Sequence, residues 1–236
     1  MATYNKILTD NVCFIDRHNK CYLYFDGVDD YILLSNITLN FGTGPMSVAL
    51  WVKYPETTTG VSIILGAGTA TNAYWIVQAN HANKFYYYPY SNVVSPITSS
   101  IVVDDNEWHF IVCVRNGTNG KIYVDGIEAG SGTSAQYNTD GTVPIKISNE
   151  NNFAGLIADV RIYNRALTLA EIKSEMYRYS IPNSNCKGMW RWDDMQGYDT
   201  KKTFDLSGNN NTGTHTGTSN GNSNPPILMQ PIYAGD

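Results

Sequence analysis

Residues 107–130, EWHFIVCVRNGTNGKIYVDGIEAG, alternate apolar and polar side chains on both sides of a short polar turn. A period of two is typical of a β-strand with one buried face, so WHFIVCVR predicts such a strand. The side chains expected to face the interior are those of Trp108, Phe110, Val112 and Val114. Asp125-Gly126, between KIYV and IEA, indicates a hairpin, because a type I′ turn needs positive φ at both central residues.

Two further stretches repeat this alternation, Met46–Lys53 (MSVALWVK) and Leu156–Tyr163 (LIADVRIY). Three strands that alternate so cleanly indicate antiparallel sheets with one buried face. In the second stretch, the side chains expected to share one face are Leu156, Ala158, Val160 and Ile162. Weaker strands are predicted at Cys21–Phe25, Tyr31–Leu34, Ser62–Leu65, Tyr74–Ala79, Lys84–Tyr90, Ile101–Val103 and Ile145–Ser148.

One short helix is predicted after Thr168. Thr168 is a suitable N-cap and Glu171 completes a capping box three residues later. Leu169, Ile172 and Met176 then supply an apolar stripe. About a dozen strands with one helix, and no parallel βαβ alternation, predict an all-β fold, a jelly-roll sandwich of two antiparallel sheets.

Composition excludes several classes of protein. The 236 residues carry 16 Lys+Arg against 21 Asp+Glu, so a basic stripe for nucleic acid is not expected. No window approaches 18 uninterrupted apolar residues, and the first twenty residues lack the pattern of a secretory signal, so we expect neither a membrane span nor a signal. Four cysteines without a C-x-x-C pair argue against zinc, and we expect them to be reduced, with Cys113 buried.

The sequence changes character after Ser180. One strand is predicted around Met189–Trp192, while Asp205–Gly221 is rich in Gly, Asn and Thr and, taken alone, is typical of a flexible linker. The prolines of PPILMQPIY (225–233) favour an extended edge segment. We therefore divide the chain into a jelly roll, 1–180, and an extension, 181–236, that supplies an edge strand and a docked tail.

Four stretches, in this order along the chain, carry a family resemblance. They are YLYFDGVDDYILL (Tyr22–Leu34), MSVALWVK (Met46–Lys53), EWHFIVCVRNG with GKIYVDGIEAG (Glu107–Gly130), and FAGLIADVRIYNRALTLAEI (Phe153–Ile172). Together they resemble the laminin G-like domains of the concanavalin A-like lectin/glucanase superfamily. The resemblance covers about Tyr22–Tyr177 and implies a jelly roll of two curved antiparallel sheets, in agreement with the strand pattern.

Gly188–Thr214 (GMWRWDD…DLSGNNNTGT) departs from the family pattern. It resembles the segment that usually opens such a domain, but here it follows the domain. Either it supplies the missing edge strand from the other end of the chain, as a natural permutation would, or it is the remnant of a second repeat. Trp190 and Trp192 favour the first explanation, because two indoles need a surface to bury against.

Acidic residues suggest a structural calcium site. Asp26, Asp29 and Asp30 lie close together at one strand end, and Ca²⁺ takes several oxygen ligands. The resemblance implies a calcium between the FDG region and an Asp in the last long strand. By position these ligands are Asp26 and Asp159, helped by backbone carbonyls near Gly42.

A second explanation needs no calcium. Asp29-Asp30 would then form only a turn, and Asp159 would pair with Arg161 or with a backbone donor. The family pattern usually has an acidic residue after this Asp, whereas Val160 follows here, which argues mildly against the metal.

Residues 74–90 form the densest aromatic stretch, and alternation along a strand must leave some of its rings outside. Aromatic rings beside Asn and Gln amides suit sugar recognition. The candidate ligand-binding residues are Trp75, Tyr86, Tyr88, Tyr90, Gln78 and Asn80. Two alternatives stay open: the tyrosines cap a sheet face without binding anything, or they form a protein–protein contact.

No catalytic motif is recognisable, and we expect no enzyme activity. Members of the superfamily that cleave glucans carry an E-x-D-x-E arrangement, which is absent, as is a G-x-S-x-G elbow. Glu171 and Glu175 lie four residues apart on the predicted helix and are expected to be solvated, and His109 to be structural or exposed.

These observations predict a non-catalytic recognition or display module. The first hypothesis is a carbohydrate-binding or adhesion jelly roll, exposed on a virus particle such as a phage. The alternative is a purely structural virion protein, a capsid decoration or tail-associated component without a glycan ligand. Expected partners are glycans or other virion and surface proteins, with a homo-oligomer open; the expected location is the virion surface or the cell exterior.

Overall fold

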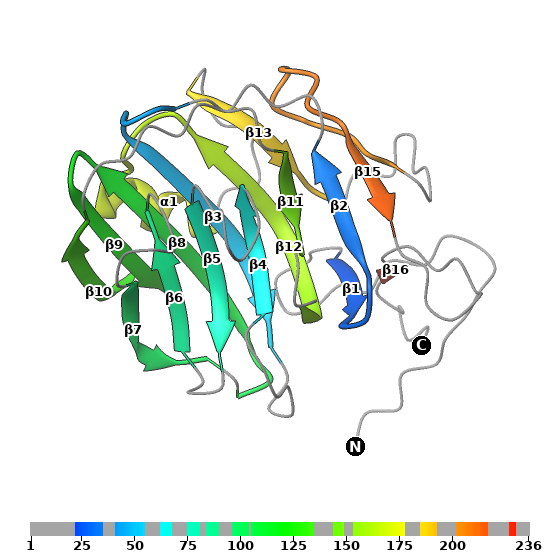
Figure 1. The fold of residues 1–236 in the computed structure, drawn as a ribbon, viewed down its shortest axis with the longest axis horizontal. Helices are drawn as coiled ribbons and strands as arrows, with labels where there is room; N and C mark the ends of the chain where they lie inside the picture. The colour runs from blue at the N-terminus through cyan, green and yellow to red at the C-terminus, as the bar shows by residue number, and fades with distance from the viewer. Residues whose placement is uncertain are drawn as a thin grey trace.

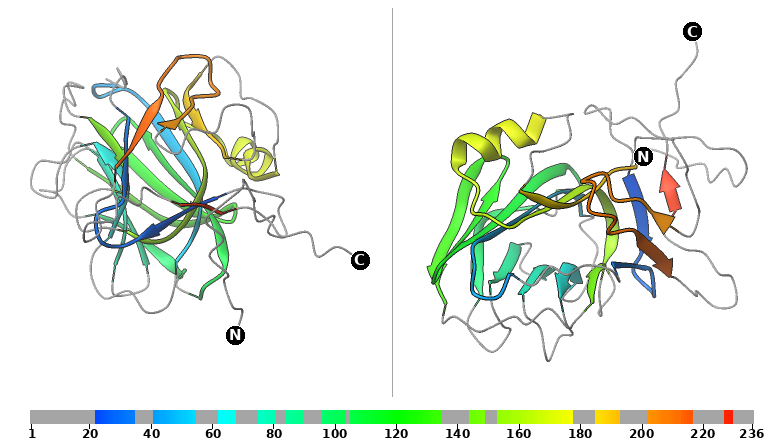
Figure 2. Two further views of the ribbon diagram at one scale, coloured as in Figure 1. Left: turned by 90° about the vertical axis from the view of Figure 1, so that its right-hand side faces the viewer. Right: turned by 90° about the horizontal axis from the view of Figure 1, so that it is seen from above.

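The computed structural model describes residues 22–34, 41–54, 62–67, 75–80, 84–89, 96–103, 105–134, 144–148, 153–177, 185–192, 202–216 and 227–229. Two eight-stranded antiparallel sheets lie face to face, and α1 (Leu169–Tyr177) covers the outer side of one of them (Figures 1 and 2). This arrangement confirms the predicted jelly-roll sandwich.

The sheet under α1 is called the first sheet. Its order is β10 (Ile127–Thr133), β9 (Asn119–Val124), β8 (Trp108–Asn116), β3 (Met46–Lys53), β12 (Ala154–Tyr163), β1 (Tyr22–Asp26), β16 (Ile227–Met229), with β13 (Cys186–Trp190) also paired to β12. The second sheet, nearer the viewer in Figure 1, has the order β14 (Lys202–Thr203), β15 (Gly213–Thr216), β2 (Tyr31–Leu34), β11 (Ile145–Ile147), β4 (Ser62–Ala67), β5 (Trp75–Asn80), β6 (Lys84–Tyr88), β7 (Ile97–Val102).

The structure confirms the predicted hairpin turn and the predicted start of the helix. Asp125 and Gly126 join β9 to β10 with φ values of 50° and 75°, both positive as a type I′ hairpin requires. Thr168 and Glu171 form the predicted capping box, with the Thr168 amide donating to Glu171 Oε2 at 2.8 Å. The strand predicted at Ile101–Val103 is longer and earlier, as β7.

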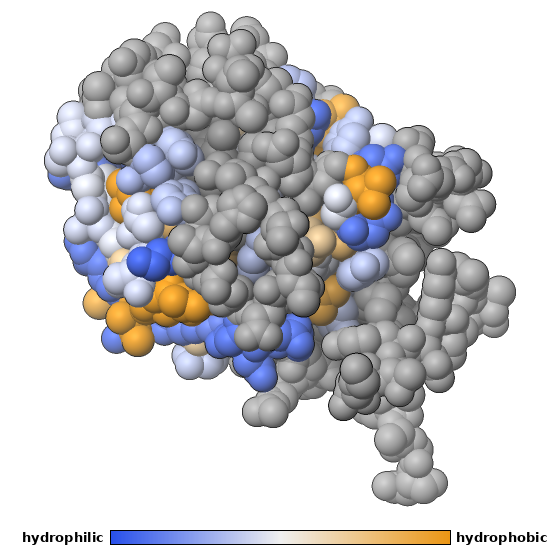
Figure 3. Space-filling view, turned by 60° about the horizontal axis from the view of Figure 1, so that its bottom comes forward, coloured by the Kyte–Doolittle hydropathy of each residue, from blue (hydrophilic) through white to orange (hydrophobic). Residues whose placement is uncertain are grey.

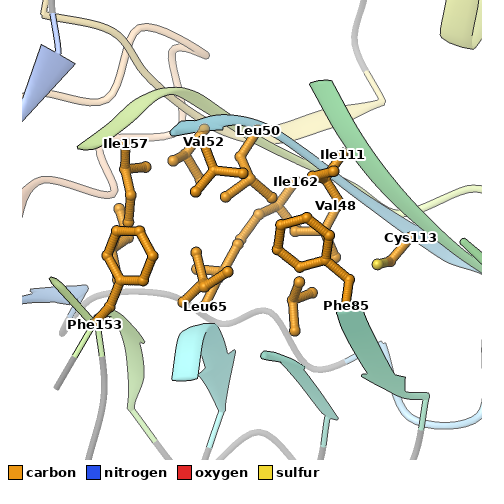
Figure 4. Packing of buried hydrophobic residues seen from close by; sticks show 14 of the residues in the cluster. Val48, Leu50, Val52, Leu65, Phe85, Ile111, Cys113, Phe153, Ile157 and Ile162 are labelled. Atoms are coloured by element: carbon orange, nitrogen blue, oxygen red, sulfur yellow. The ribbon is translucent and has the colours of Figure 1, made fainter. Parts of the chain in front are cut away.

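The space between the sheets holds the larger hydrophobic cluster. Figure 4 shows β3 contributing Val48, Leu50 and Val52 from above, while Leu65 of β4 and Phe85 of β6 reach up from the second sheet. All five are buried, so this layer joins the two sheets.

The three central strands of the first sheet, β3, β8 and β12, are largely buried on both faces, which corrects the expectation that they have one buried face. Under α1, Trp51 of β3 and Phe110 of β8 form a second cluster with Ile172 of the helix. In β8, the residues between the sheets are Ile111 and Cys113. Phe110, Val112 and Val114, expected to face the space between the sheets, therefore face the helix side. A period of two reveals two faces but not which one the second sheet covers.

Alternation along β12 is broken by a β-bulge. The pairing with β3 shifts between Ala158 and Arg161, and Asp159 has a φ of 49°. Beyond the bulge, Val160 joins the core between the sheets while Ala158 lies on the helix side. The four residues expected on one face are therefore split between both faces: Leu156 and Ala158 on the helix side, Val160 and Ile162 between the sheets.

The extension adds strands to both sheets. β13 pairs with β12, β15 pairs with β2, and β16 pairs with β1. The indole nitrogens of Trp190 and Trp192 donate to Asn211 O at 2.8 Å and to Thr203 Oγ1 at 3.0 Å.

The segment that follows β14 is an ordered turn built around Asp205. Its carboxylate accepts hydrogen bonds from the amides of Met189, Ser207 and Asn211 at 2.8–3.0 Å. The side-chain amides of Asn209 and Asn211 also donate to the carbonyls of Cys186 and Lys187, at 3.1 and 2.6 Å, so several side chains hold the described part of the linker-like stretch. Cys113 and Cys186 are buried free thiols, and Cys13 and Cys21 lie outside the described residues.

Candidate functional site

The outer face of the second sheet carries two of the candidate tyrosines. Along β6, Phe85 and Tyr87 point into the core, whereas Lys84, Tyr86 and Tyr88 are partly exposed on the opposite side. Burial, and then the neighbouring Tyr86, raise the pKa of Tyr88 above its usual value. Tyr86 and Tyr88 therefore offer adjacent rings and hydroxyls on one rigid strand.

The other candidates are placed only through the backbone. Gln78 pairs with Tyr86 and Asn80 pairs with Lys84 across the β5–β6 ladder, while Trp75 pairs with Ala67 of β4. The side chains of Trp75, Gln78 and Asn80, and the whole of Tyr90, lie outside the described residues.

Sequence reasoning missed other residues of this face. Thr98 of β7 is exposed and lies opposite Tyr86 in the ladder. On the other half of the sheet, Lys146 Nζ lies 4.8 Å from the ring centroid of Tyr31, a cation–π contact. Thr98 and Lys146 belong to no local motif. They lie on the same face as the candidate tyrosines only because their strands pair within one sheet.

The described surface carries only scattered apolar side chains in one view of the molecule. Figure 3 shows hydrophobic residues in separate patches between hydrophilic ones. The exposed large apolar residues come from several elements, some of which are neighbours, such as β7 and β10: Tyr24, Val28, Val102, Ile127, Leu169, Tyr177 and Phe204. Single exposed apolar residues are ordinary on a protein surface.

Asp26, Asp29 and Asp30 form an acidic cluster where β1 turns into β2. One carboxylate oxygen of each lies within 4.8 Å of the others. Gly27 has a φ of 80°, and a Cβ there would come within 2.7 Å of Ala154 Cβ, so the turn requires glycine.

Asp30 is the unusual member of this cluster. It is 3% exposed; its Oδ2 accepts from the Asp26 amide at 3.0 Å, and its Oδ1 has no hydrogen-bond partner among the described residues. Burial, and then the charges of Asp26 and Asp29, raise the pKa of Asp30 to about 6. A divalent cation would offset both effects, so these residues fit a Ca²⁺ ion.

Asp159 does not join the cluster, so the calcium site expected between Asp26 and Asp159 is wrong in its geometry. Asp26 pairs with Ala154 at the start of β12, whereas Asp159 lies beyond the middle of that strand. Both Asp159 oxygens accept from Arg161, at 2.7 and 2.6 Å. This Asp159–Arg161 ion pair agrees with the explanation that needs no calcium. The Gly42 carbonyl accepts from Arg115 at 3.0 Å.

Arg161 also binds Glu175 of α1, and Tyr163 Oη donates to Glu175 Oε2 at 3.0 Å. Glu175 is buried, so the expectation that both helix glutamates are solvated is wrong for it. Glu171 forms an ion pair with Arg165 at 2.8 Å, which lowers the pKa of Glu171 to about 2. The buried network therefore ties α1 to the first sheet.

His109 has a structural place between two turns. Its Nδ1 lies 2.7 Å from Asp125 and its Nε2 lies 3.0 Å from Asp105. Burial alone would lower the pKa of His109, but the hydrogen bonds and charges of the two carboxylates outweigh it and raise that pKa. His109 thus links the turn before β8 to the β9–β10 hairpin.

Comparison with known proteins identifies the family. A family model described as the concanavalin A-like lectin/glucanases superfamily matches residues 25–173, which confirms the resemblance found in the sequence. The chain belongs to this superfamily.

Two solved structures share the fold. A protein of Bacteroides ovatus, to which carbohydrate binding has been assigned provisionally, superposes with a TM-score of 0.68 at 14% identity and covers 84% of this chain and 58% of its own. A heptameric SAP-like pentraxin from Limulus polyphemus superposes with a TM-score of 0.52 at 13% identity and covers 65% of this chain and 80% of its own.

A curated relative is the adhesion G-protein coupled receptor V1 of Danio rerio. It is 26% identical over 155 residues, which amount to 60% of this chain and 2% of the receptor. The chain thus spans a small part of that relative and little more than half of the Bacteroides protein. Within its described part, none of the helical structure is long and apolar enough to cross a membrane.

Proposed function

We propose that this chain is a non-catalytic carbohydrate-binding or adhesion module, and that its glycan binds to the outer face of the second sheet. The observation that carries the proposal is the outward pair Tyr86 and Tyr88 on β6, whose neighbours Phe85 and Tyr87 are held in the core. The family, and the provisional assignment of the Bacteroides protein, support the same ligand class.

The geometry supports binding for a physical reason. A tyrosine ring offers an apolar face for sugar C–H groups and a hydroxyl for sugar oxygens. Because the flanking residues of β6 are buried, little motion of the strand has to be frozen when a ligand binds. The exposed hydroxyl of Thr98, opposite Tyr86, adds a polar group at the edge of the rings.

Binding without hydrolysis is supported by the residue types on this face. A glycosidase of the usual kind needs a pair of carboxyl groups beside the scissile bond. The described strands of the second sheet contain neither Asp nor Glu. The buried pair Asp159 and Glu175 faces Arg161 on the other side of the molecule.

We further propose that the module is displayed on a virion surface or at a cell exterior. Charged residues make up only 16% of the chain, and Asp205–Gly221 is rich in Asn, Thr and Gly, a composition that suits a displayed protein. A purely structural virion role, such as capsid decoration, would use the same fold without a glycan.

We also propose a structural Ca²⁺ at Asp26, Asp29 and Asp30. The Oδ1 of buried Asp30, which has no hydrogen-bond partner within the described part of the chain, supports it, and the ion would offset most of the charge of three carboxylates in one turn. Calorimetric titration of chelator-stripped protein should give binding heat that Asp30→Asn abolishes and that Glu128→Gln, on exposed β10, leaves intact. No heat in the parent protein would dispose of the ion.

A glycan array tests the proposed function. The parent protein should bind a defined set of glycans, with and without calcium, and Tyr86→Ala or Tyr88→Ala should weaken binding at least tenfold. Tyr177→Ala, at an exposed position on α1, is the matched control and should bind normally. A blank array with folded protein would favour the purely structural role.

A further inference from the structure

The charges on the second sheet are all of one sign. Its described strands contain three lysines, Lys84 on β6, Lys146 on β11 and Lys202 on β14, and no Asp, Glu or Arg. The whole chain, in contrast, has a net charge of −5. The described strands of this sheet therefore carry only positive side-chain charge, while the acidic cluster of Asp26, Asp29 and Asp30 lies in the turn before β2.

All three lysines are on the outer face. Lys146 lies between Ile145 and Ile147, which are both buried in the core between the sheets. Lys84 precedes buried Phe85. Lys202 is exposed and precedes buried Thr203, whose hydroxyl is held by Trp192. Because side chains alternate along a strand, the three amines share the side that carries Tyr86 and Tyr88.

Strand register brings two of these lysines into one line with a candidate tyrosine. Consecutive partners across the sheet are Lys202, Thr214, Leu33, Lys146, Gly66, Ile76 and Tyr88. At roughly 4.8 Å per strand, this row is about 30 Å long, with Lys146 near its middle. A ligand lying across the strands could therefore meet both amines and the Tyr88 ring.

The amines are available to a ligand. Lys121 on the first sheet is paired with Glu128 at 2.8 Å, whereas none of the three lysines forms an ion pair within the described chain. Lys146 Nζ lies over the Tyr31 ring at 4.8 Å, a contact that orients the amine without neutralising it.

We infer that the ligand of this face is an acidic glycan, an extended chain that carries carboxylate or sulfate groups. The inference rests on the proposed function and names its ligand class. A positive row on a negative protein concentrates an anionic chain at one face, because the rest of the surface repels it. The length of the row suits several acidic sugars in sequence better than a single one.

The test uses two matched pairs of probes, with chelator present so that calcium cannot bridge protein and ligand. One pair is an oligogalacturonate and the same oligosaccharide with its carboxyl groups reduced to alcohols; the other is dextran sulfate and dextran. The protein should bind an acidic member at least tenfold more tightly than its neutral partner. Binding should weaken between 50 and 300 mM salt, as screening predicts.

Variants locate the effect. Lys146→Gln and Lys202→Gln should each lower the affinity for the acidic probe by up to about fivefold. Lys173→Gln, at an exposed position on α1, should leave it unchanged.

Three results would overturn the inference. Equal affinity for the acidic and neutral members would remove the acidic ligand class but leave glycan binding standing. An equal loss in Lys173→Gln would assign the effect to net charge rather than to this face. Binding of no probe here and no glycan on the array would remove both the inference and the proposed function.

Discussion

The two sheets differ in how many of their faces are needed for packing. In the first sheet, β3 buries Val48 and Leu50 against the second sheet and Trp51 against α1. In the second sheet, β6 buries Phe85 on one side and leaves Tyr86 partly exposed on the other. The outward side chains of β6 are therefore not needed to fill the core between the sheets, and a binding function can be built there without loss of the fold.

Charge follows the same division. In the first sheet, the buried guanidinium of Arg161 forms ion pairs with the carboxylates of Asp159 and Glu175. The lysines of the second sheet have no such partners in the described chain. Substitutions on the first sheet should thus change stability, and those on the outer face of the second should change binding.

The largest effect is expected from Arg161→Ala. It would remove the cation that pairs with the buried carboxylates of Asp159 and Glu175, which costs about 3–5 kcal/mol of unfolding free energy. Urea unfolding measures this loss of unfolding free energy. Lys173→Ala, at an exposed position, is the control, and its unfolding free energy should lie within about 0.5 kcal/mol of the parent. A loss below about 1 kcal/mol in Arg161→Ala would show that the network does not anchor α1.

Adjacent residues on β6 give the sharpest comparison. Phe85→Ala should cost about 3–5 kcal/mol of stability because it leaves a cavity between the sheets. Tyr86→Ala should cost less than about 1 kcal/mol but weaken glycan binding at least tenfold. Thermal unfolding and glycan titration of both variants separate the two roles. The comparison would fail if Tyr86→Ala lost stability as Phe85→Ala does.

Sequence patterns predicted what depends on neighbours along the chain. The hairpin at Asp125-Gly126, the capping box at Thr168 and the alternation that leaves some aromatic rings of residues 74–90 outside all follow from short-range rules. The bulge at Asp159 could not be predicted, because a positive φ in a strand leaves no periodic signal.

Pairing between distant strands limited the prediction of the site. Lys146 and Lys202 lie far apart in sequence, and only the registers of β14, β15, β2 and β11 align them. The Asp26–Asp159 pairing failed for the same reason, since the register of β1 places Ala154, not Asp159, beside Asp26.

A moderate effect is expected at Asp30. Its pKa is about 6 in the fold and 3.8 ordinarily, so the folded chain holds the proton more tightly and metal-free protein loses stability as pH rises from about 4 to 6. Asp30→Asn cannot ionise and should be about 1–3 kcal/mol more stable than metal-free parent at pH 7.5, with no advantage at pH 3.5.

Calcium should reverse this ranking by stabilising the parent and not Asp30→Asn. The unfolding free energies of both proteins, measured once in chelator and once in calcium, give this ranking. If the unfolding free energy of the metal-free parent did not change between pH 4 and 6, the carboxyl group of Asp30 would not have the raised pKa that its burial implies.

The smallest effect is expected at His109. Its raised pKa means that the protonated imidazole is favoured in the fold, so its contribution is complete below about pH 6.5 and fades as pH rises through the folded-state value. His109→Gln should therefore be less stable than the parent at pH 5.5, by about 1 kcal/mol, and nearly equal to it at pH 8.5. The opposite trend in urea midpoints would mean that Asp105 and Asp125 do not hold a charged imidazole.

The central claim, that ligand binds the outer face of the second sheet, is tested most directly by mapping amide chemical shifts during titration with a glycan selected on the array. The account predicts saturable shifts in β6 and its neighbours β5 and β7, with the amides of α1 unmoved. Shifts confined to α1 or to the Asp205 turn, or no shifts at saturating glycan, would contradict it.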